Sequence, residues 1–597
     1  MRTPEIPGEL PTPNMLRAAA LLALLAGALL VAAAQAGPDY ERYLDWARVA
    51  LSGDLFEIRS DVRSPMGVPF HQWSHGPGFF LAIPSAATGG LLPVPWGARL
   101  AGAVAALALF LAWARALMLA ARGSRALVVL GLGLAFLATH AGFYATAYGT
   151  ATLSLAAGAI VAARLLDPRP WTAAASLTVG VGCAVALLAR VPLGALVVTA
   201  VLWALVRAWR DRPRTFWIGS LWLDAVALGA PLVAALVQIG FVYRWMTGSP
   251  LRSPYNFGDG QFASVDLARA EFGTVLWHSY HGLLAYHPLY ALGAAAMVAA
   301  LVRRLRERRW LGAAAVMGLA AGLAAQLVIV ASWYCWWMGE GSFGQRGLAA
   351  GTLVLLPLLL EEIELSKGRR RTAWLAAASL CGLWSAALLW RGESAFPNWA
   401  DLADAQLAMA THAAFLVAIV ASAAVGAATH ARLRCGTPAA LGIAAAGLSI
   451  ATLLRRALLA AGAVERGSGL LILGTVLGAV GGAWLAARAL DPTRWETPAR
   501  APSRWDRRPW WGRIGVALLT VAFLAECGLF LRIAVRTENA LSARDTSSRP
   551  LKLEERMQGP VPLSSVEDAI RELERLPEFR DQREELLQFH ERVLPAR

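Results

Sequence analysis

Residues 15–36 read MLRAAALLALLAGALLVAAAQA, and the next seven residues, 37–43, read GPDYERY. The first segment carries a single charged side chain, Arg17. An apolar helix of about 20 residues crosses the hydrocarbon core of a bilayer, which is about 30 Å thick. The second segment places two carboxylates, Asp39 and Glu41, directly after that run. We therefore expect a membrane span that delivers two acidic side chains to the membrane surface.

The whole chain is rich in hydrophobic residues, like this first span. Of its 597 residues, 57% are hydrophobic, and the mean hydropathy is +0.50. A water-soluble chain of this composition would expose large apolar patches. Apolar runs of spanning length recur along the sequence. The sequence therefore predicts an all-α polytopic membrane protein.

The distribution of charged residues indicates the orientation of membrane spans rather than binding to nucleic acid. The formal net charge is +15, and such a surplus also occurs in nucleic-acid-binding proteins. Here the basic residues are almost all arginines, many in short loops between apolar runs, and the only lysines are Lys367 and Lys552. That distribution orients membrane spans, so we expect no nucleic-acid partner. The five cysteines show no C-x-x-C or other short metal-type spacing, which argues against a zinc or redox site.

We expect about 13–15 transmembrane helices. The candidate spans are 15–36, 97–120, 126–143, 150–164, 172–189, 192–207, 216–241, 283–302, 311–332, 347–362, 373–390, 406–428, 437–454, 469–489 and 514–532. Alternate connections are rich in arginine, which marks them as cytoplasmic and places residues 1–14 on the same side. Ala34-Gln35-Ala36 also fits a signal-peptidase site, so the first span is either a retained anchor or a cleaved leader.

Span parity assigns the remaining connections to the extracytoplasmic side. The three longest are a large first outer loop, 37–95, a second, 242–281, and a third, 333–346. Shorter outer segments carry Tyr148 and Arg190. After the spans of 361–533, residues 534–597 form a charged tail with a capping box at Ser564-x-x-Glu567, which predicts a short helical module outside the membrane. It is either an interaction module or a solvated end.

Asp39 and Glu41 are the first candidates for chemistry. A carboxylate at the mouth of a span avoids most of the cost of membrane burial and can act there as a general base or a metal ligand. The alternative is structural, since acidic residues near the start of an amphipathic helix over 40–51 would favour its N-terminal dipole.

The same outer loop contains Pro69-Phe-His-Gln-Trp-Ser-His-Gly-Pro-Gly78. His71 and His75 are four residues apart, so one helical turn would place both on one face. With Asp39 or Glu41 they can bind a divalent cation such as Mg²⁺ or Mn²⁺. Gly76-Pro77-Gly78 argues against a helix at this point, however. In the alternative, the histidines hydrogen-bond a sugar or phosphate, and Trp73 offers a stacking surface.

The third outer loop, Trp333-Tyr-Cys-Trp-Trp-Met-Gly-Glu-Gly-Ser-Phe-Gly-Gln-Arg346, combines tryptophans with glycines. An interfacial aromatic belt explains the tryptophans. The glycines would let the backbone approach a ligand closely, and Arg346 can clamp a phosphate or extend to the membrane interface. Arg190 lies between two apolar spans and needs a counter-ion, for which a lipid phosphate or Asp39 would serve.

Several of these motifs together resemble the GT-C superfamily of integral-membrane glycosyltransferases. The similarity is strongest to bacterial relatives of dolichyl-phosphate-mannose-protein mannosyltransferase, glycosyltransferase family 39. It covers roughly residues 15–360. The motifs are Gly37-Pro-Asp39-Tyr-Glu-x-Tyr43, His71-Gln-Trp-Ser-His-Gly-Pro-Gly78, Gly248-Ser-Pro250, Gly282-Leu-Leu-Ala-Tyr-His-Pro288 and Trp336-Trp-x-Gly-x-Gly-Ser-Phe-Gly-Gln-Arg346.

The resemblance implies direct, inverting transfer of a monosaccharide, a hexose or a pentose, from a polyprenyl-phosphate donor. Asp39 would be the base that deprotonates the acceptor hydroxyl, and Arg346, with Arg190, would stabilise the departing phosphate. Tyr148 and Tyr255 join the outer-side candidates for substrate binding. That branch usually shows adjacent acidic residues, whereas Tyr40 separates Asp39 from Glu41 here, which leaves the role of Glu41 and the acceptor class open.

The sequence thus predicts an enzyme of the bacterial plasma (inner) membrane whose active site faces away from the cytoplasm. Its partners would be the lipid donor, membrane lipid and a protein, lipid or cell-envelope acceptor. Two other classes remain. A transporter or flippase for a lipid-linked or anionic solute would place charges within its spans, and a non-catalytic membrane scaffold would use the tail.

Overall fold

The computed structural model describes most of the chain between residues 35 and 543. The described residues are 35–36, 40–60, 63–71, 73–121, 124–144, 147–148, 150–167, 169–211, 217–254, 267–333, 343–352, 354–391, 396, 398–433, 436–460, 469–490 and 510–543. The predicted first span at 15–36 therefore lies outside them except for its last two residues, and so does the tail from residue 544 onward.

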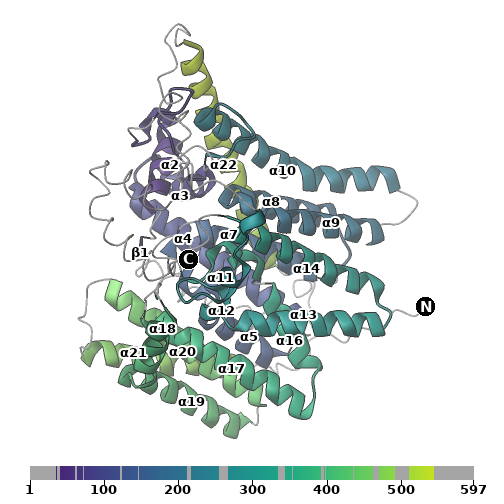
Figure 1. The fold of residues 1–597 in the computed structure, drawn as a ribbon, viewed down its shortest axis with the longest axis vertical. Coiled ribbons are helices and arrows are strands. Elements are labelled where there is room, and N and C mark those ends of the chain that lie inside the picture. The colour runs from purple at the N-terminus through teal and green to yellow at the C-terminus, as the bar shows by residue number, and fades with distance from the viewer. Residues whose placement is uncertain are drawn as a thin grey trace.

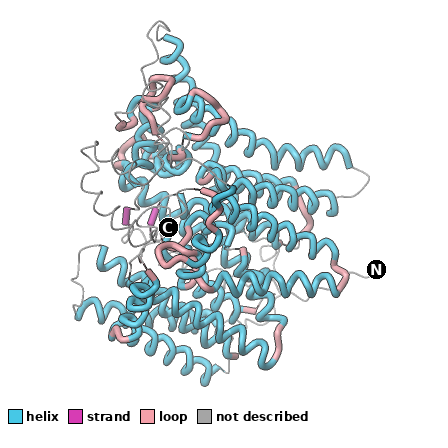
Figure 2. Tube along the Cα trace, in the orientation of Figure 1, coloured by secondary structure: helices cyan, strands magenta, loops and turns pink. Residues whose placement is uncertain are grey.

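Helices account for nearly all of the described structure (Figure 2). They are α2 (Tyr40–Ser52), α3 (His75–Ala87), α4 (Val94–Ala120), α5 (Arg125–Leu137), α6 (His140–Tyr144), α7 (Thr150–Leu166), α8 (Ala173–Ala189), α9 (Gly194–Asp211), α10 (Trp217–Thr247), α11 (Phe272–Trp277), α12 (Leu283–Tyr286), α13 (Leu289–Arg306), α14 (Trp310–Ala331), α15 (Ala349–Thr352), α16 (Leu355–Leu365), α17 (Gly368–Arg391), α18 (Trp399–Ala410), α19 (Ala413–Leu433), α20 (Thr437–Ala460), α21 (Gly469–Leu490) and α22 (Trp510–Ala543). Two short strands, β1 (Gln35–Ala36) and β2 (Ala147–Tyr148), pair in parallel.

Among the described residues, seven helices are long and apolar enough to cross a membrane. They lie at Val94–Ala120, Val191–Asp211, Leu221–Thr247, Trp310–Ala331, Gly368–Arg391, Ala413–Arg432 and Thr437–Arg456. Four shorter apolar helices accompany them, at Ala126–Leu137, Ala151–Leu166, Ala173–Ala189 and Leu471–Ala487. The chain is a multi-pass helical membrane protein, as the sequence predicts.

Three predicted spans are interrupted. The span expected at 283–302 divides into α12 and α13 around Pro288, whose ring removes a backbone donor. The span expected at 126–143 divides into α5 and α6, and the one at 347–362 into α15 and α16. Hydropathy averaged along the sequence does not register a local break, which explains why these segments are predicted as single helices.

The first outer loop contains the helices α2 and α3. The expected helix over 40–51 is confirmed as α2. No helical turn joins His71 to His75, as expected, because α3 begins only at His75. Gly76-Pro77-Gly78 does not prevent a helix, however, since all three residues lie in the first turn of α3. Proline is tolerated there, since the first backbone N–H groups of a helix have no partner within it.

The longer helices lie side by side with their ends at two faces (Figure 1). The C-terminal ends of α9 and α13 lie on one side, at the right of Figure 1. We call this the ion-pair end, because buried Asp167 accepts hydrogen bonds from Arg115 and Arg169 there and Glu362 pairs with Arg303. Further ion pairs of this end are Arg164–Asp167, Arg207–Asp211, Arg304–Glu361 and Arg370–Glu362. The opposite end, where α9 and α13 begin, we call the site end.

The last described helix returns to the start of the chain. α22 packs against α2, α3, α8 and α10, and Arg536 donates from Nη1 to the carbonyl of Ser52 at 2.6 Å. The tail predicted from residue 534 therefore begins later, because α22 continues to Ala543.

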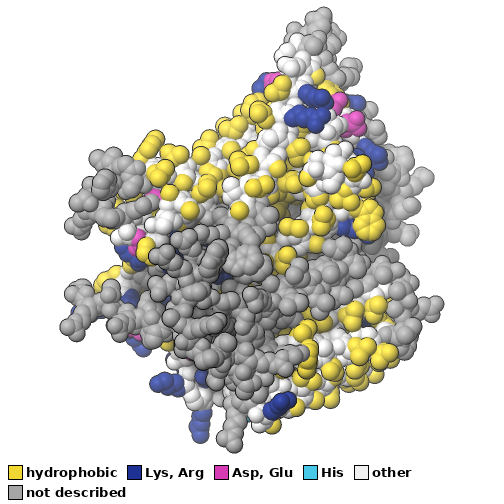
Figure 3. Space-filling model, turned by 180° about the vertical axis from the view of Figure 1, so that it is seen from behind, with side chains coloured by type: hydrophobic (Ala, Val, Ile, Leu, Met, Phe, Trp, Pro, Cys, Tyr) yellow, Lys and Arg dark blue, Asp and Glu magenta, His cyan; other side chains and the backbone are white. Residues whose placement is uncertain are grey.

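Apolar side chains cover much of the outside of the bundle. Figure 3 shows hydrophobic side chains spread over one face, with arginine and lysine mainly toward its margins. Trp222, Leu202 and Val233 on α9 and α10 are 71%, 58% and 59% exposed. Side chains of this kind on the outside of spanning helices suit contact with lipid.

Candidate functional site

Segments far apart in sequence meet at the site end. Strand β1 consists of the last two residues of the predicted first span, and β2 follows α6. The register pairs Gln35 with Ala147 and Ala36 with Tyr148. The chain that leads to Asp39 therefore runs beside the segment that carries Tyr148.

The structure describes some of the predicted site residues only in part. Asp39 and Tyr255 lie outside the described residues. Glu41 lies in the first turn of α2 and Tyr148 in β2, and for both the backbone is described but the side chain is not. The pairing of β1 with β2 is thus what locates the start of the first outer loop.

Arg190 and Arg346, 156 residues apart, are brought together. Arg190 donates from Nη1 to the backbone carbonyl of Arg346 at 3.1 Å. Arg190 ends α8 in an extended conformation, because Pro192 opens a short 3-10 turn before α9. Gln326 of α14 donates from Nε2 to the carbonyl of Gly347 at 2.9 Å. The predicted phosphate-binding segment is therefore anchored to α14 and to the junction between α8 and α9.

Two histidines that sequence reasoning missed, His140 and His287, lie beside the segment that carries Gly344 and Arg346. The rings of His140 and His287 have centroids 4.1 Å apart, and both side chains are fully buried. His140 Nδ1 lies 3.1 Å from the hydroxyl of Tyr290. Gly344 adopts a φ of +64°, and a Cβ there would lie 3.0 Å from the His287 ring. His287-Pro288 is part of the quoted motif at 282–288, but the motif alone gave no reason to pair His287 with His140.

Burial keeps these histidines neutral. Both imidazoles are 0% exposed, and an interior of low dielectric constant disfavours their charged form. Neutral imidazoles accept or donate hydrogen bonds but carry no charge. Positive charge at the site end therefore comes from arginines.

The first outer loop forms a second cluster around Trp46 of α2. His71 is buried, and its ring meets the indoles of Trp46 and Trp73 edge-on at 5.3 and 5.4 Å. Burial, aided by the charge of Arg42, lowers the pKa of His71 to about 3. The His75 ring also meets Trp46, at 6.0 Å. The two histidines do not share a helical face, since His71 precedes α3, yet both contact the same indole.

Two predictions concern this loop, a stacking surface at Trp73 and a site for a divalent cation. The Arg42 guanidinium lies 5.4 Å from the centre of the Trp73 ring, so a cation already occupies one face of that indole. Within the described ranges, no cluster of three or more His, Cys, Asp or Glu side chains can hold a metal ion. Because the side chains of Asp39 and Glu41 lie outside those ranges, a cation held by them with His75 stays a prediction.

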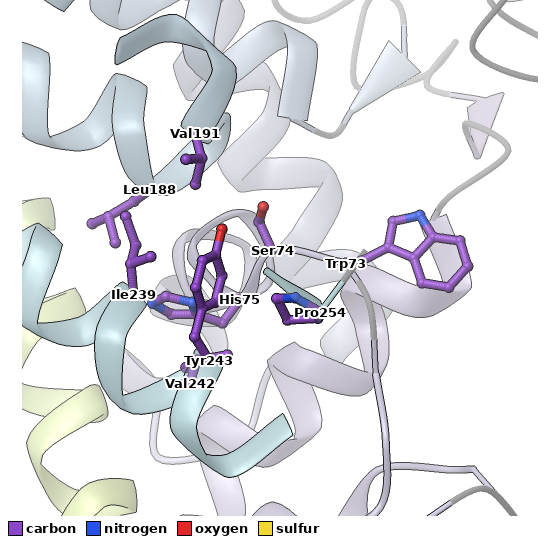
Figure 4. Close-up of a pocket in the computed structure, with 9 residues that line it drawn as sticks. All are labelled: Trp73, Ser74, His75, Leu188, Val191, Ile239, Val242, Tyr243 and Pro254. Carbon is purple, nitrogen blue, oxygen red and sulfur yellow. The ribbon is translucent and has the colours of Figure 1, made fainter. Parts of the chain in front are cut away.

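A small pocket lies between the first outer loop and the junction of α8 and α9 (Figure 4). It is lined by Trp73, Ser74, His75, Leu188, Val191, Ile239, Val242, Tyr243 and Pro254. In Figure 4 the Trp73 indole lies at the far edge and points away from the other side chains. Arg190 lies in sequence between two lining residues, so the pocket is next to the arginine that contacts the third loop.

Two further arginines reach the site end from α20, which the sequence resemblance does not cover. Arg455 donates from Nη1 to the carbonyl of Trp390. Arg456 lies over the ring of Phe143 at 5.0 Å, and Phe143 stacks on Phe343 at 4.9 Å. The C-terminal helices therefore add positive charge beside the third outer loop.

Comparisons with known proteins return two solved structures. No protein-family model and no curated protein matches the chain. ArnT from Cupriavidus metallidurans bound to undecaprenyl phosphate is 16% identical with a TM-score of 0.44, and the match covers 79% of this chain and 77% of that one. ArnT in the apo state is 16% identical with a TM-score of 0.38, over 79% and 76% of the two chains. Similarity at this level assigns no activity to the present chain.

Proposed function

We propose that this chain is a GT-C-type membrane glycosyltransferase that moves a monosaccharide from a polyprenyl-phosphate donor to an extracytoplasmic acceptor. The observation that carries the proposal is the contact between Arg190 and the backbone of Arg346. It joins two guanidinium-bearing segments at the end of the bundle where β1 leads toward Asp39. Guanidinium groups suit phosphate recognition because their planar donors match phosphate oxygens.

The proposed reaction is a single inverting displacement. Asp39 takes the proton of the acceptor hydroxyl as that oxygen bonds to the anomeric carbon of the sugar. The bond between the anomeric carbon and the donor phosphate oxygen breaks, and the polyprenyl phosphate leaves with the bonding electron pair. Arg346 and Arg190 stabilise the negative charge that develops on the phosphate, in a site from which buried aromatic side chains exclude water.

The neutral histidines suit hydrogen bonding rather than charge. His75, Ser74 and Tyr243 border the pocket, whose volume of about 10 Å³ has room for one hydroxyl group of the sugar. We place the enzyme in the bacterial plasma membrane, with family 39 as the branch that its motifs resemble. Mg²⁺ or Mn²⁺ held by Asp39, Glu41 and His75 would neutralise phosphate charge in a metal-dependent form of the reaction.

The test is transfer by purified protein in lipid nanodiscs, with radiolabelled polyprenyl-phosphate sugars as donors. Asp39→Asn should reduce transfer by about 10²- to 10⁴-fold, the usual contribution of a general base. Asp54→Asn is the matched control, because Asp54 is exposed in the same outer loop and caps a short 3-10 turn that asparagine also caps.

The same assay has clear contrary outcomes. Equal activity of Asp39→Asn and wild type would remove Asp39 as the base, and no turnover of any donor by wild type would refute the glycosyltransferase. EDTA treatment of wild type decides the metal prediction, since loss of transfer that Mg²⁺ or Mn²⁺ restores would support a cation site.

Transport of an anionic solute is a second candidate, which one observation favours. Glu526 of α22 is fully buried within a long helix, and carboxyl groups inside membrane proteins often belong to transport pathways. Flux of lipid-linked sugar across proteoliposomes that Glu526→Gln abolishes, without any sugar transfer, would favour the transporter.

A further inference from the structure

A buried chain of hydrogen bonds joins the last described helix to the first outer loop. Glu526 of α22 accepts from Nε2 of Gln238 of α10 at 3.0 Å. Gln238 Oε1 lies 3.3 Å from Nε2 of His75, the first residue of α3. The three side chains are 0%, 3% and 2% exposed. Buried polar groups need hydrogen-bond partners, so the orientation of Gln238 between Glu526 and His75 affects which atoms of His75 donate and accept.

The amide of Gln238 directs its donors toward α22 and its oxygen toward His75. A glutamine amide has two N–H donors and one acceptor oxygen. Here Nε2 donates to Glu526 and lies 3.4 Å from Sγ of Cys527, a weak acceptor. Both donors are therefore used on the α22 side, and Oε1 is left facing His75. The reversed amide would suit only a protonated Glu526 carboxyl or a donating Cys527 thiol, and it would direct an N–H group at His75.

This orientation fixes the tautomer of His75. Because Oε1 of Gln238 can only accept, Nε2 of His75 must carry the proton. His75 is 2% exposed, and burial favours the neutral imidazole, in which Nδ1 is then an acceptor. The rings of Trp46, Phe79 and Phe530 surround the imidazole at 6.0, 5.2 and 5.8 Å and limit its rotation.

His75 also borders the pocket of Figure 4, where its neighbours include Ser74 and Tyr243. We propose that Glu526, acting through Gln238, is a positioning residue that keeps His75 protonated at Nε2 and leaves Nδ1 to accept a hydrogen bond from a hydroxyl group of the ligand in this pocket. The identity of that ligand as a sugar rests on the proposed function, but the tautomer does not.

The tautomer can be measured in the wild-type protein. We would label the nine histidines with ¹⁵N, place the protein in nanodiscs and record ¹⁵N spectra at pH 7, since protonated and unprotonated ring nitrogens differ widely in chemical shift. The signals absent from His75→Phe belong to His75. We expect a protonated Nε2 and an unprotonated Nδ1. A protonated Nδ1, or an imidazolium, would overturn the proposal without any variant of Glu526.

Variants then test the role of Glu526. In Glu526→Leu the amide loses its carboxyl acceptor and is free to reverse, so the His75 signals should become a mixture of both tautomers. Glu538→Gln is the control on the same helix, because Glu538 pairs with Arg244 and Trp245 instead, and it should leave the His75 signals unchanged. Unaltered His75 signals in folded Glu526→Leu would show that Glu526 does not position the ring.

Kinetics separate this proposal from the proposed function. With polyprenyl-phosphate sugar as donor, we expect Glu526→Leu and Gln238→Leu each to lower kcat/KM about tenfold, the usual effect of one lost hydrogen bond. The double variant should also lose about tenfold, because both changes act on the same imidazole. Independent losses that multiply to about a hundredfold would contradict the chain. Absence of transfer in wild type would refute the glycosyltransferase and leave the tautomer result standing.

Discussion

Two groups of arginines, one at each end of the bundle, make described contacts of different kinds. At the ion-pair end, Arg115 and Arg169 contact the carboxylate of Asp167. At the site end, Arg190 donates to a backbone carbonyl and Arg456 lies over an aromatic ring. A carboxylate cancels the charge of a guanidinium, whereas contact with a carbonyl or a ring orients a guanidinium without itself cancelling the charge. The first arrangement suits a structural role, and the second suits attraction of an anion.

The largest expected effect breaks the ion-pair end. Asp167→Asn keeps the size of the side chain but removes the charge that its arginines share, and Asp167 is only 1% exposed. Loss of one partner from a buried ion pair costs about 3–5 kcal/mol. Arg115 and Arg169 are 26% and 47% exposed and regain water, so we expect the lower part of that range. Chemical unfolding in mixed micelles should show this loss, while kcat at a temperature where the variant is folded should stay near the wild-type value.

The pH dependence of this variant gives an independent check. Burial alone would raise the pKa of Asp167, but hydrogen bonds from Arg169 and the charge of Arg115 outweigh it and hold that pKa below its usual value. The stabilisation is therefore fully present above the unfolded pKa of about 3.9 and is lost as the pH falls through the lower folded pKa. The difference in Tm between wild type and variant should be constant from pH 8 to pH 5. A difference that shrinks between pH 8 and pH 6 would contradict this assignment.

The next effect breaks the site end. Arg346→Ala should lower kcat by about 10²- to 10³-fold, as loss of one donor to a developing oxyanion does, with Tm nearly unchanged. Arg252→Ala is the control, since Arg252 is an exposed arginine in the second outer loop. If Arg346→Ala instead lowers Tm as much as Asp167→Asn does and retains kcat, both ends are structural and the comparison fails.

A smaller effect compares two glycines with left-handed backbones, one at each end. Gly344 has a φ of +64° and lies against His287, whereas Gly368 has a φ of +52° with no atom within 4 Å of an added Cβ. Alanine costs about 1–2 kcal/mol in this conformation at either position. Only Gly344→Ala should also displace the segment that carries Arg346, so transfer should fall about tenfold there and stay unchanged in Gly368→Ala. Equal activities of the two variants would show that the backbone conformation of Gly344 does not determine the position of Arg346.

The sequence predicts the helices well because apolar length is a local property. Span 97–120 corresponds to α4 and span 311–332 to α14, with ends that differ by a few residues. Where helices break is decided by single residues such as Pro288, which a hydropathy average does not detect. The helix from His75 shows the converse, since Pro77 is allowed in a first turn.

The candidate site could be predicted only as a set of residues on one side. Arg190 and Arg346 are each unusual at the edge of an apolar run, so the sequence selects them. Their contact depends on how α14 packs against α9 and the 3-10 turn that follows Arg190. His140 and His287 are 147 residues apart in sequence. In the chain of hydrogen bonds, Glu526 is 288 residues from Gln238, and Gln238 is 163 residues from His75. No local pattern encodes such contacts, because they arise from tertiary packing.

The smallest expected effect is that of removing an exposed carboxylate at the ion-pair end. It shows whether the loss of stability depends on the burial of the carboxylate or only on its position at that end. Glu307 pairs with Arg309 at 3.1 Å, and their side chains are 41% and 66% exposed. An exposed pair contributes about 0–1 kcal/mol, since water and salt screen it, so Glu307→Gln should barely change the free energy of unfolding and should leave kcat unaltered. A cost close to that of Asp167→Asn would mean that every carboxylate at this end is needed to offset its arginines. A negligible cost would confine the structural role to the buried carboxylates, which is the contrast with the site end that the arginine contacts suggest.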